Sequence, residues 1–231
     1  MIKVVIFDLD DTLYDYKNND IRAITKVRDY VKKNFGLDND TFNKVFELTK
    51  KDIKKKLGKN SASSHNRTIY FKQFLQRINI NPCVYTNVLY DLYWNTILNN
   101  ITLFDGVLEL FEFLKSQKIN IAICSNLTTN IQIKKINQLK ISEYVDYLIT
   151  SEEVGVEKPN RLIFLNVLNF FKVEPQEAIF IGDDFKCDII GARKVGIEGV
   201  LISQLENSES NPKKVFRHIS QEILEKNKLK L

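Results

Sequence analysis

Five short runs of apolar residues are spaced along the chain, and each run is nearly continuous rather than alternating with polar residues. They cover residues 2–7, 119–124, 147–150, 178–181 and 199–202. Such runs are typical of strands that are buried on both faces, as in a parallel sheet. Amphipathic helical patterns over residues 106–116, 129–139 and 160–171 lie before and between the later runs. This alternation predicts an α/β fold with a three-layer, doubly wound parallel sheet.

Residues 15–100 break this alternation because they contain almost no strand-like run. Apolar residues recur there at helical spacing in four stretches, and glycines and an Asn-Pro pair mark the breaks between them. An insert of about 85 residues after the first strand is far longer than the usual connection of about 2–6 residues. We therefore predict two domains: a core formed by residues 1–14 and 101–231, and an α-helical cap, acting as a lid, formed by residues 15–100.

Composition and charge narrow the classes of protein that fit this pattern. Hydrophobic residues make up 44% of the 231 residues and charged residues 27%, which are ordinary globular values and exclude a disordered or low-complexity chain. The formal net charge is +5, but the predicted cap carries +8 while residues 1–14 with 101–212 carry −7. A basic cap favours an anionic substrate.

Other sequence features concern location and partners. No apolar run approaches the roughly 20 residues needed to cross a bilayer, and the beginning MIKVVIFDLDDTL does not resemble a signal peptide. The three cysteines form no CxxC pair of the kind that indicates zinc or redox chemistry. The basic C-terminal tail lacks interleaved aromatic residues and includes two glutamates. We expect a cytoplasmic protein without a membrane or nucleic-acid partner, and both a monomer and a homodimer fit the sequence.

Acidic residues follow the first predicted strand directly. Asp8, Asp10 and Asp11 place three carboxylates within four positions. Like charges this close raise one another's pKa unless a cation neutralises them. Open α/β sheets bind ligands at the carboxyl edge of the strands, and oxygen ligands in this number favour Mg²⁺. Taken alone, the motif also fits a solvated acidic turn.

Suitable polar residues follow the other predicted strands as well. They are Ser125 and Asn126 after the second run, Lys158 before the third helical pattern, and Asp183, Asp184 and Asp188 after the fourth run. Because the carboxyl ends of parallel strands share one edge, we expect hydroxyl, ammonium and carboxylate groups to meet there. Pro159 is expected in the first turn of the helix that follows Lys158.

The order and spacing of these residues resemble the motifs of the haloacid dehalogenase (HAD) superfamily. The four motifs are Asp8-Leu9-Asp10-Asp11-Thr12, Ser125, Lys158 and Gly182-Asp183-Asp184 with Asp188. Each motif is weak alone, but four in order, each at or just after a strand end, are specific. The resemblance covers residues 1–14 and roughly 101–202. It implies a HAD-like Rossmannoid core with a C1-type helical cap, and the activity of a phosphoric monoester hydrolase.

The resemblance implies a role for each carboxylate. Asp8 would attack phosphorus and form an aspartyl-phosphate, and Asp10 would protonate the leaving alcohol and later deprotonate the hydrolytic water. Mg²⁺ would be held by Asp8, by the backbone carbonyl of Asp10 and by Asp183. Asp184 would ligate the metal directly or through water. Asp188 would be an alternative ligand, or would orient the lysine of the third motif or a metal-bound water.

The resemblance also implies how the phosphate is held. The Ser125 hydroxyl and the Asn126 backbone N–H would bind a phosphate oxygen, and Lys158 would neutralise the phosphoryl group and the nucleophile. Taken alone, Ser125 would be an ordinary turn hydroxyl and Lys158 a solvated lysine at a helix start. Their place at the same sheet edge as the acids favours the functional interpretation.

The expected substrate is a small anionic phosphate monoester of the nucleotide or sugar phosphate class. Tyr14, Lys17 and Asn18 lie just past the catalytic loop, so we predict that they contact the substrate. Arg67 begins a predicted helix of the cap and is a further candidate. No residue of the cap identifies a base, a sugar or an acid.

Two alternative functions fit this pattern, and a third activity of the fold, dehalogenation, does not. A phosphomutase would use the same aspartyl-phosphate but return the phosphoryl group to a bound intermediate. A phospho-acceptor, regulatory or binding module would keep the acidic site with little turnover. By resemblance, the dehalogenases of this fold attack carbon without a second acid or a metal, so the presence of both Asp10 and Asp183 favours phosphoryl transfer.

Overall fold

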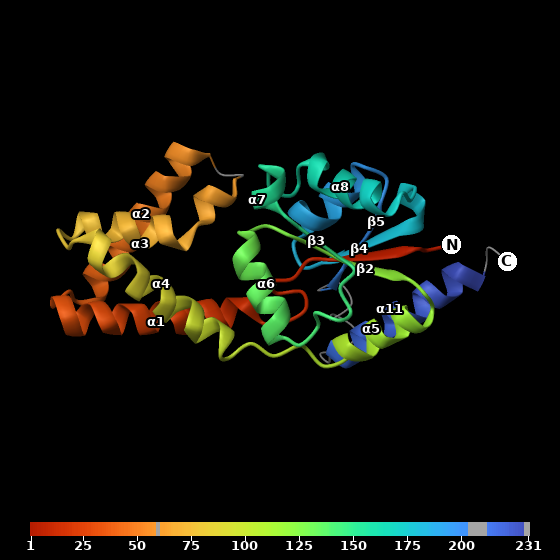
Figure 1. Ribbon diagram of the computed structural model, residues 1–231, viewed down its shortest axis with the longest axis horizontal. Helices are drawn as coiled ribbons and strands as arrows, with labels where there is room; N and C mark the ends of the chain where they lie inside the picture. Colours follow the sequence, from red (N-terminus) through yellow and green to blue (C-terminus); the bar gives the residue numbers. More distant parts are fainter. Residues whose placement is uncertain (59–60, 203–211, 229–231) are drawn as a thin grey trace. The chain divides into compact units, whose positions relative to one another are not determined.

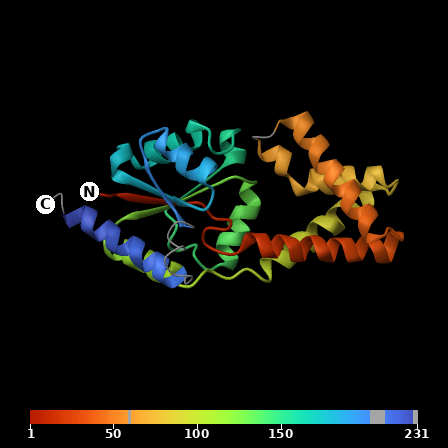
Figure 2. The same cartoon turned by 180° about the vertical axis from the view of Figure 1, so that it is seen from behind.

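The computed structural model describes residues 1–58, 61–202 and 212–228. It separates into two compact units, one formed by Met1–Asp15 with Thr102–Leu231 and the other by Tyr16–Ile101. The first, which we call the core unit, contains a sheet, and the second, which we call the helical unit, contains helices (Figures 1 and 2).

A five-stranded parallel sheet forms the centre of the core unit and confirms the predicted α/β fold class. Its strands, in spatial order, are β3 (Tyr147–Thr150), β2 (Asn120–Ser125), β1 (Val4–Phe7), β4 (Ala178–Gly182) and β5 (Glu198–Leu201). In the middle, Val4 is level with Asn120 on one side and Ala178 on the other. The strand order reverses between β1 and β4, and open α/β sheets bind ligands outside the carboxyl ends at such a point.

Helices cover both faces of the sheet (Figures 1 and 2). The helical segments of the core unit are α5 (Val107–Ser116), α6 (Thr129–Gln138), α7 (Ser151–Val154), α8 (Arg161–Phe171), η2 (Pro175–Glu177), η3 (Phe185–Ile189), α9 (Ile190–Arg193) and α11 (Pro212–Lys228). On one face, α8 places Phe164 against Phe180 with ring centroids 5.3 Å apart. On the other, α5 places Phe111 against Phe7 at 5.1 Å. The two aromatic contacts belong to two cores, which together fix the sheet between its helices.

The buried face of α6 differs from the sequence prediction. The apolar spacing predicts that Ile133, Ile136 and Leu139 form this face, but Ile133 is 46% exposed while Gln132 and Lys135 are fully buried. These two polar side chains bind groups at the carboxyl edge of the sheet. The helix is therefore rotated so that it delivers polar groups to that edge.

The start of α8 also differs from the prediction. The Asn160 side chain accepts the Leu162 N–H at 3.0 Å and caps a helix that begins at Arg161. An N-cap satisfies one of the unpaired N–H groups of the first turn. Pro159 therefore precedes the helix instead of lying in its first turn.

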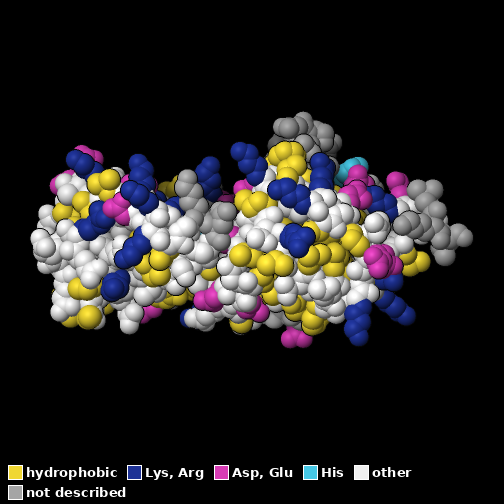
Figure 3. All heavy atoms as spheres, turned by 90° about the horizontal axis from the view of Figure 1, so that it is seen from above, with side chains coloured by type: hydrophobic (Ala, Val, Ile, Leu, Met, Phe, Trp, Pro, Cys, Tyr) yellow, Lys and Arg dark blue, Asp and Glu magenta, His cyan; other side chains and the backbone are white. Residues whose placement is uncertain are grey.

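The helical unit has an aromatic interior. Its segments are α1 (Tyr16–Phe35), α2 (Asn39–Leu57), η1 (Ala62–His65), α3 (Arg67–Arg77) and α4 (Pro82–Leu98). Phe46 of α2 stacks on Phe71 of α3 with centroids 5.9 Å apart, and Phe42 meets Phe74 at 4.9 Å. Most lysines of the unit lie outside this interior, and Figure 3 shows Lys and Arg side chains spread over the visible face of this unit.

One apolar stripe of α4 is not where the sequence predicts it. The spacing predicts that Val84, Val88 and Leu92 are buried, but Val84 is 56% and Val88 40% exposed. Tyr93 and Ile97 are fully buried instead. Since α4 carries apolar residues around much of its circumference, the larger aromatic side chain decides the inward face. Neither α4 nor any other helix in the described part of the chain is long and apolar enough to span a membrane.

Candidate active site

Asp8 lies directly after β1, at the carboxyl edge of the sheet. Its backbone N–H donates to the Ile181 carbonyl at 2.9 Å, so the sheet fixes its position, and its side chain is buried. The chain then turns at Asp11, whose φ is 59°. After this turn, the Thr12 hydroxyl lies 3.5 Å from Asp8 Oδ2 and 3.3 Å from Asp183 Oδ1. The turn therefore holds the first and fourth motifs together.

Lys158 supplies the buried positive charge of the site. Its Nζ lies 2.5 Å from Asp8 Oδ1 and 2.7 Å from Asp188 Oδ1, and its side chain is 2% exposed. Burial alone would lower the pKa of Lys158, but the charges of Asp188 and Asp8 raise that pKa well above its ordinary value. The ammonium group is therefore charged at neutral pH and offsets part of the carboxylate charge around it.

Three carboxylates share this place. Asp8, Asp183 and Asp188 each offer one oxygen, and the three atoms lie within 4.8 Å of one another. Burial and then neighbouring carboxylates, opposed by Lys158, raise the pKa of Asp8 to about 8. Burial and the charges of Asp188 and Asp11 raise the pKa of Asp183 to about 6. One ammonium group does not neutralise three carboxylates, so this set of oxygen donors fits a hard divalent cation such as Mg²⁺.

The raised pKa of Asp8 predicts how stability depends on pH when divalent cations are chelated. The pKa is 3.8 ordinarily and about 8 in the folded protein. The contribution of Asp8 to stability is therefore fully present below about pH 4 and is lost as the pH rises through about 8. We expect the melting temperature in EDTA to fall between about pH 5 and pH 8.5 relative to that of Asp8→Asn, and Mg²⁺ to reverse most of this fall. Parallel curves for the two proteins would contradict the pKa assignment.

The adjacent acids Asp183 and Asp184 are used differently. Asp184 caps η3, since its Oδ1 accepts the N–H groups of Lys186 and Cys187, each at 2.8 Å. Partial burial acts to raise the pKa of Asp184, but these bonds lower it below its ordinary value. Asp184 is therefore committed to the backbone, whereas Asp183 belongs to the acid cluster.

Gly182, the last residue of β4, makes room for Asp188. A Cβ at that position would lie 2.2 Å from Asp188 Oδ2. The same Oδ2 accepts the Asp184 N–H at 3.1 Å, while the other carboxylate oxygen faces Lys158. The Asp188 carboxylate is thereby fixed between the end of the strand and the ammonium group.

The second motif is tied to the third by side-chain hydrogen bonds. The Asn126 side chain accepts the Lys158 N–H at 2.8 Å and donates to the Lys158 carbonyl at 3.3 Å. Ser125 is buried, and its hydroxyl accepts a bond of 2.6 Å from Gln132 Nε2. Sequence reasoning did not identify Gln132, which fixes the Ser125 oxygen from α6.

The Asp10 carboxylate has two partners that sequence reasoning did not assign to it. Lys135 Nζ lies 2.7 and 2.8 Å from its two oxygens, and the Tyr14 hydroxyl donates to Oδ1 at 2.5 Å. Tyr14 is fully buried and its hydroxyl is bonded to Asp10, and a contact with substrate stays a prediction. The apolar spacing of α6 predicts a different buried face, so the sequence carries no signal for Lys135.

The remaining candidates lie in the helical unit. Lys17 and Asn18 are exposed in the first turn of α1. The Arg67 guanidinium donates to the Tyr16 hydroxyl at 2.7 Å and to the His65 carbonyl at 2.8 Å, and its side chain is 12% exposed. Arg67 therefore links α1, η1 and α3 within this unit, and a contact with substrate stays a prediction.

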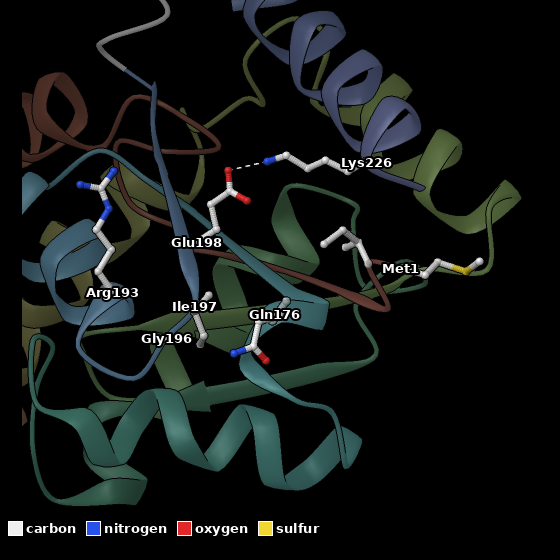
Figure 4. A pocket seen from close by; sticks show the side chains of 9 residues that line it. Met1, Gln176, Arg193, Gly196, Ile197, Glu198 and Lys226 are labelled. Carbon is white, nitrogen blue, oxygen red and sulfur yellow. Dashed lines mark hydrogen bonds and ion pairs between the residues drawn. The ribbon is translucent and has the colours of Figure 1, made fainter. Parts of the chain in front are cut away.

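A separate cavity of about 590 Å³ opens at the opposite edge of the sheet (Figure 4). It is lined by Met1, Ile2, Gln176, Ala178, Arg193, Gly196, Ile197, Glu198 and Lys226. Lys226 of α11 forms an ion pair with Glu198 of β5 across it. Its lining includes one carboxylate, already paired, so we assign the chemistry to the carboxyl edge.

Comparisons with known proteins agree with the motifs at that edge. A sequence profile described as haloacid dehalogenase-like hydrolase matches residues 5–202. A ribulose-1,5-bisphosphate 5-phosphatase of Halopiger xanaduensis is 35% identical, over 91% of this chain and 88% of that protein. A glyceraldehyde 3-phosphate phosphatase of Methanothermobacter thermautotrophicus is 31% identical, over 90% and 89%.

The same fold is found among solved structures. The 2-haloacid dehalogenase of Pseudomonas syringae pv. Tomato superposes with a TM-score of 0.68 over 88% of this chain and 87% of that protein, at 21% identity. This likeness concerns the fold alone, whereas the profile match covers most of the chain and includes all four motifs. The chain therefore belongs to the haloacid dehalogenase-like hydrolase family.

Proposed function

We propose that the protein is a Mg²⁺-dependent phosphatase that hydrolyses the phosphate monoester of a small phosphorylated sugar through an aspartyl-phosphate on Asp8. The observation that carries the proposal is the group of charges at the end of β1. There Lys158 contacts Asp8 at 2.5 Å, and Asp183 and Asp188 complete a cluster of oxygen donors. Phosphoryl transfer to a carboxylate needs this kind of site, because nucleophile and substrate are both negatively charged.

The donor groups for the metal come from the first and the fourth motifs. Asp8, Asp183 and the Asp10 carbonyl would hold Mg²⁺, with Asp188 beside them. When bound, the ion supplies positive charge to the phosphoryl oxygens and to the nucleophile. Lys158 supplies a second positive charge from the protein, and Asp188 keeps that ammonium group in place through the 2.7 Å ion pair.

The first half-reaction transfers the phosphoryl group to the protein. A carboxylate oxygen of Asp8 forms a bond to phosphorus as the bond from phosphorus to the leaving oxygen breaks. Asp10 donates its proton to that oxygen, so that the sugar leaves as a neutral alcohol. The Ser125 hydroxyl, held by Gln132, and the Asn126 N–H bind a phosphoryl oxygen during the transfer.

The second half-reaction restores the free protein. Asp10, now ionised, takes a proton from a water molecule as the water oxygen attacks phosphorus. The bond between phosphorus and Asp8 breaks, and inorganic phosphate leaves. Lys158 neutralises the Asp8 carboxylate that is released.

Relatives and charge both support a small, strongly anionic substrate. Two relatives are named as phosphatases of ribulose-1,5-bisphosphate and of glyceraldehyde 3-phosphate, a five-carbon and a three-carbon sugar phosphate. The segment 15–100 carries a net charge of +8, which favours a dianionic ester. Such esters do not cross bilayers, so a cytoplasmic location suits an enzyme that acts on them where they are made.

A phosphate-release screen tests the proposal. It compares triose, pentose and hexose phosphates, nucleotides and p-nitrophenyl phosphate, each with Mg²⁺ and with EDTA. We expect release that EDTA removes, with kcat/KM highest for triose or pentose phosphates. Release that EDTA does not affect would contradict the dependence on Mg²⁺. A preference for nucleotides would contradict the proposed substrate class. A bisphosphate product that accumulates during turnover would indicate a mutase instead.

A further inference from the structure

Lys135 is buried in an unusual way for a surface helix. Its side chain is fully buried, whereas its neighbour Lys134 on the same helix is exposed. From α6 its Nζ reaches both oxygens of Asp10, at 2.7 and 2.8 Å, and the Tyr14 hydroxyl reaches Oδ1 at 2.5 Å. Two residues from distant parts of the sequence therefore converge on one carboxylate.

Packing does not account for this lysine. Removing an ammonium group and a carboxylate from water costs free energy that their attraction only partly returns, and an apolar side chain of similar volume often packs at least as well. Position 135 lies on the same buried face as Ile131 and Ile136, where methionine would continue the apolar surface. A buried ion pair at such a position points to a role in fixing the geometry of Asp10.

The bonds make the two oxygens of Asp10 unequal. Within the described residues, Oδ1 accepts bonds from both Lys135 and Tyr14, while Oδ2 accepts a bond from Lys135. Tyr14 is itself fixed, because it is fully buried and its backbone bridges to those of Asp10 and Leu103. The carboxyl group is thus held in one orientation, and Oδ2 keeps a lone pair for a proton.

We propose that Lys135 is a positioning residue that, with Tyr14, orients the Asp10 carboxyl group so that Oδ2 exchanges the proton of the reaction. The inference rests on the proposed phosphatase function. In the first half-reaction the proton on Oδ2 passes to the leaving oxygen as its bond to phosphorus breaks and the bond from Asp8 forms. In the second, Oδ2 takes a proton back from the attacking water. Without Lys135 the carboxyl group turns, and proton transfer is the step that slows.

The test compares two esters that differ in how much they need a proton. p-Nitrophenyl phosphate releases a stable anion and needs little help from an acid, while phenyl phosphate has nearly the same shape and a far more basic leaving group. For Lys135→Met we expect kcat/KM for phenyl phosphate to fall about 10- to 100-fold, and for p-nitrophenyl phosphate by less than about 3-fold. Lys135→Arg, which keeps the cation, should recover part of the loss, and the exposed Lys134→Met is the matched control.

The effect should also depend on Asp10. In an Asp10→Asn background, adding Lys135→Met should change kcat/KM for phenyl phosphate by less than about 2-fold, because both changes remove the same proton transfer. Tyr14→Phe removes a single oxygen and should show the same preference for the activated ester, so it replaces Lys135→Met if that variant does not fold.

Distinct results overturn the inference and the function on which it rests. Equal losses for the two esters, or no loss for either, would show that Lys135 does not act through the proton on Asp10. Additive losses in the Asp10→Asn background would overturn it as well. If the wild-type protein releases no phosphate, or if Asp8→Asn does not remove that release, both the phosphatase function and the inference are overturned.

Discussion

Asp8→Asn is expected to lower kcat for the best phosphate ester by at least about 10³-fold while the protein stays folded. The amide has nearly the same shape as the carboxylate, but its oxygen is a poor nucleophile and does not form the aspartyl-phosphate. Steady-state release of phosphate with Mg²⁺ measures the loss. Acid quenching during turnover should trap phosphate on the wild-type protein and none on the variant.

The thermal stability of Asp8→Asn shows whether a loss of activity comes from the missing nucleophile or from unfolding. Burial and neighbouring carboxylates raise the pKa of Asp8 to about 8, so an uncharged side chain is well tolerated at this position in the absence of metal. We therefore expect the melting temperature of Asp8→Asn in EDTA to equal or exceed that of the wild type at neutral pH. The matched control is Asp11→Asn, because asparagine tolerates the φ of 59° at this position in the same acidic loop. If Asp8→Asn keeps near wild-type kcat, Asp8 is not the nucleophile.

The sheet could be predicted closely because its strands are buried on both faces. Each of the five apolar runs begins and ends within two residues of the beginning and end of a strand, and the run 147–150 coincides with β3. A buried parallel strand has to be apolar at every position, so its ends are visible in the sequence. The helices were predicted as elements but not always by face, as Ile133 and Val84 show, since apolar residues on several sides leave the choice to tertiary packing.

The same distinction holds for the site. Asp8 and Asp183 could be predicted because each directly follows a strand, and parallel strands bring their carboxyl ends to one edge. Lys158 could be predicted because it lies in the loop between α7 and α8, beyond the carboxyl end of β3. Lys135 lies 125 residues along the chain from Asp10, whose carboxylate it contacts. It lies on a helix, where the position at the end of a strand cannot be used to predict the contact. Whether a residue on a neighbouring helix positions a catalytic group therefore depends on the rotation of that helix, and the apolar spacing of α6 predicts a different rotation from the one observed.

Lys158→Met is expected to impair both catalysis and folding. The variant loses the charge that offsets the phosphoryl group, and we expect kcat/KM to fall about 10³-fold. It also leaves the buried carboxylates of Asp8 and Asp188 without their ammonium partner. Because removing one member of a buried ion pair costs about 3–5 kcal/mol, we expect the free energy of unfolding to fall by about this amount. Urea denaturation in EDTA at pH 7.5 measures the second effect, and the exposed Lys186→Met of η3 is the control.

The loss of stability should depend on pH with a definite sign. Without the ammonium group, the folded-state pKa of Asp8 lies even further above its unfolded value, so the folded protein retains a proton that the unfolded chain releases. Asp8 is protonated in both folded proteins below about pH 8, so the deficit in stability that Asp8 causes in Lys158→Met is expected to grow as the pH rises through about 8. A difference in stability that does not change with pH would mean that lost packing, rather than the unpaired carboxylates, destabilises the variant.

A second substitution distinguishes the two functions of this lysine. In Lys158→Met with Asp188→Asn, the removal of one carboxylate relieves the repulsion at the end of β4, and we expect at least half of the lost free energy of unfolding to return. Turnover should not return, because the positive charge next to Asp8 and the phosphoryl group is still missing. Recovery of both properties would mean that Lys158 serves to hold the acid cluster together and that another cation neutralises the phosphoryl group. Recovery of stability alone would assign the ammonium group of Lys158 to the chemical step.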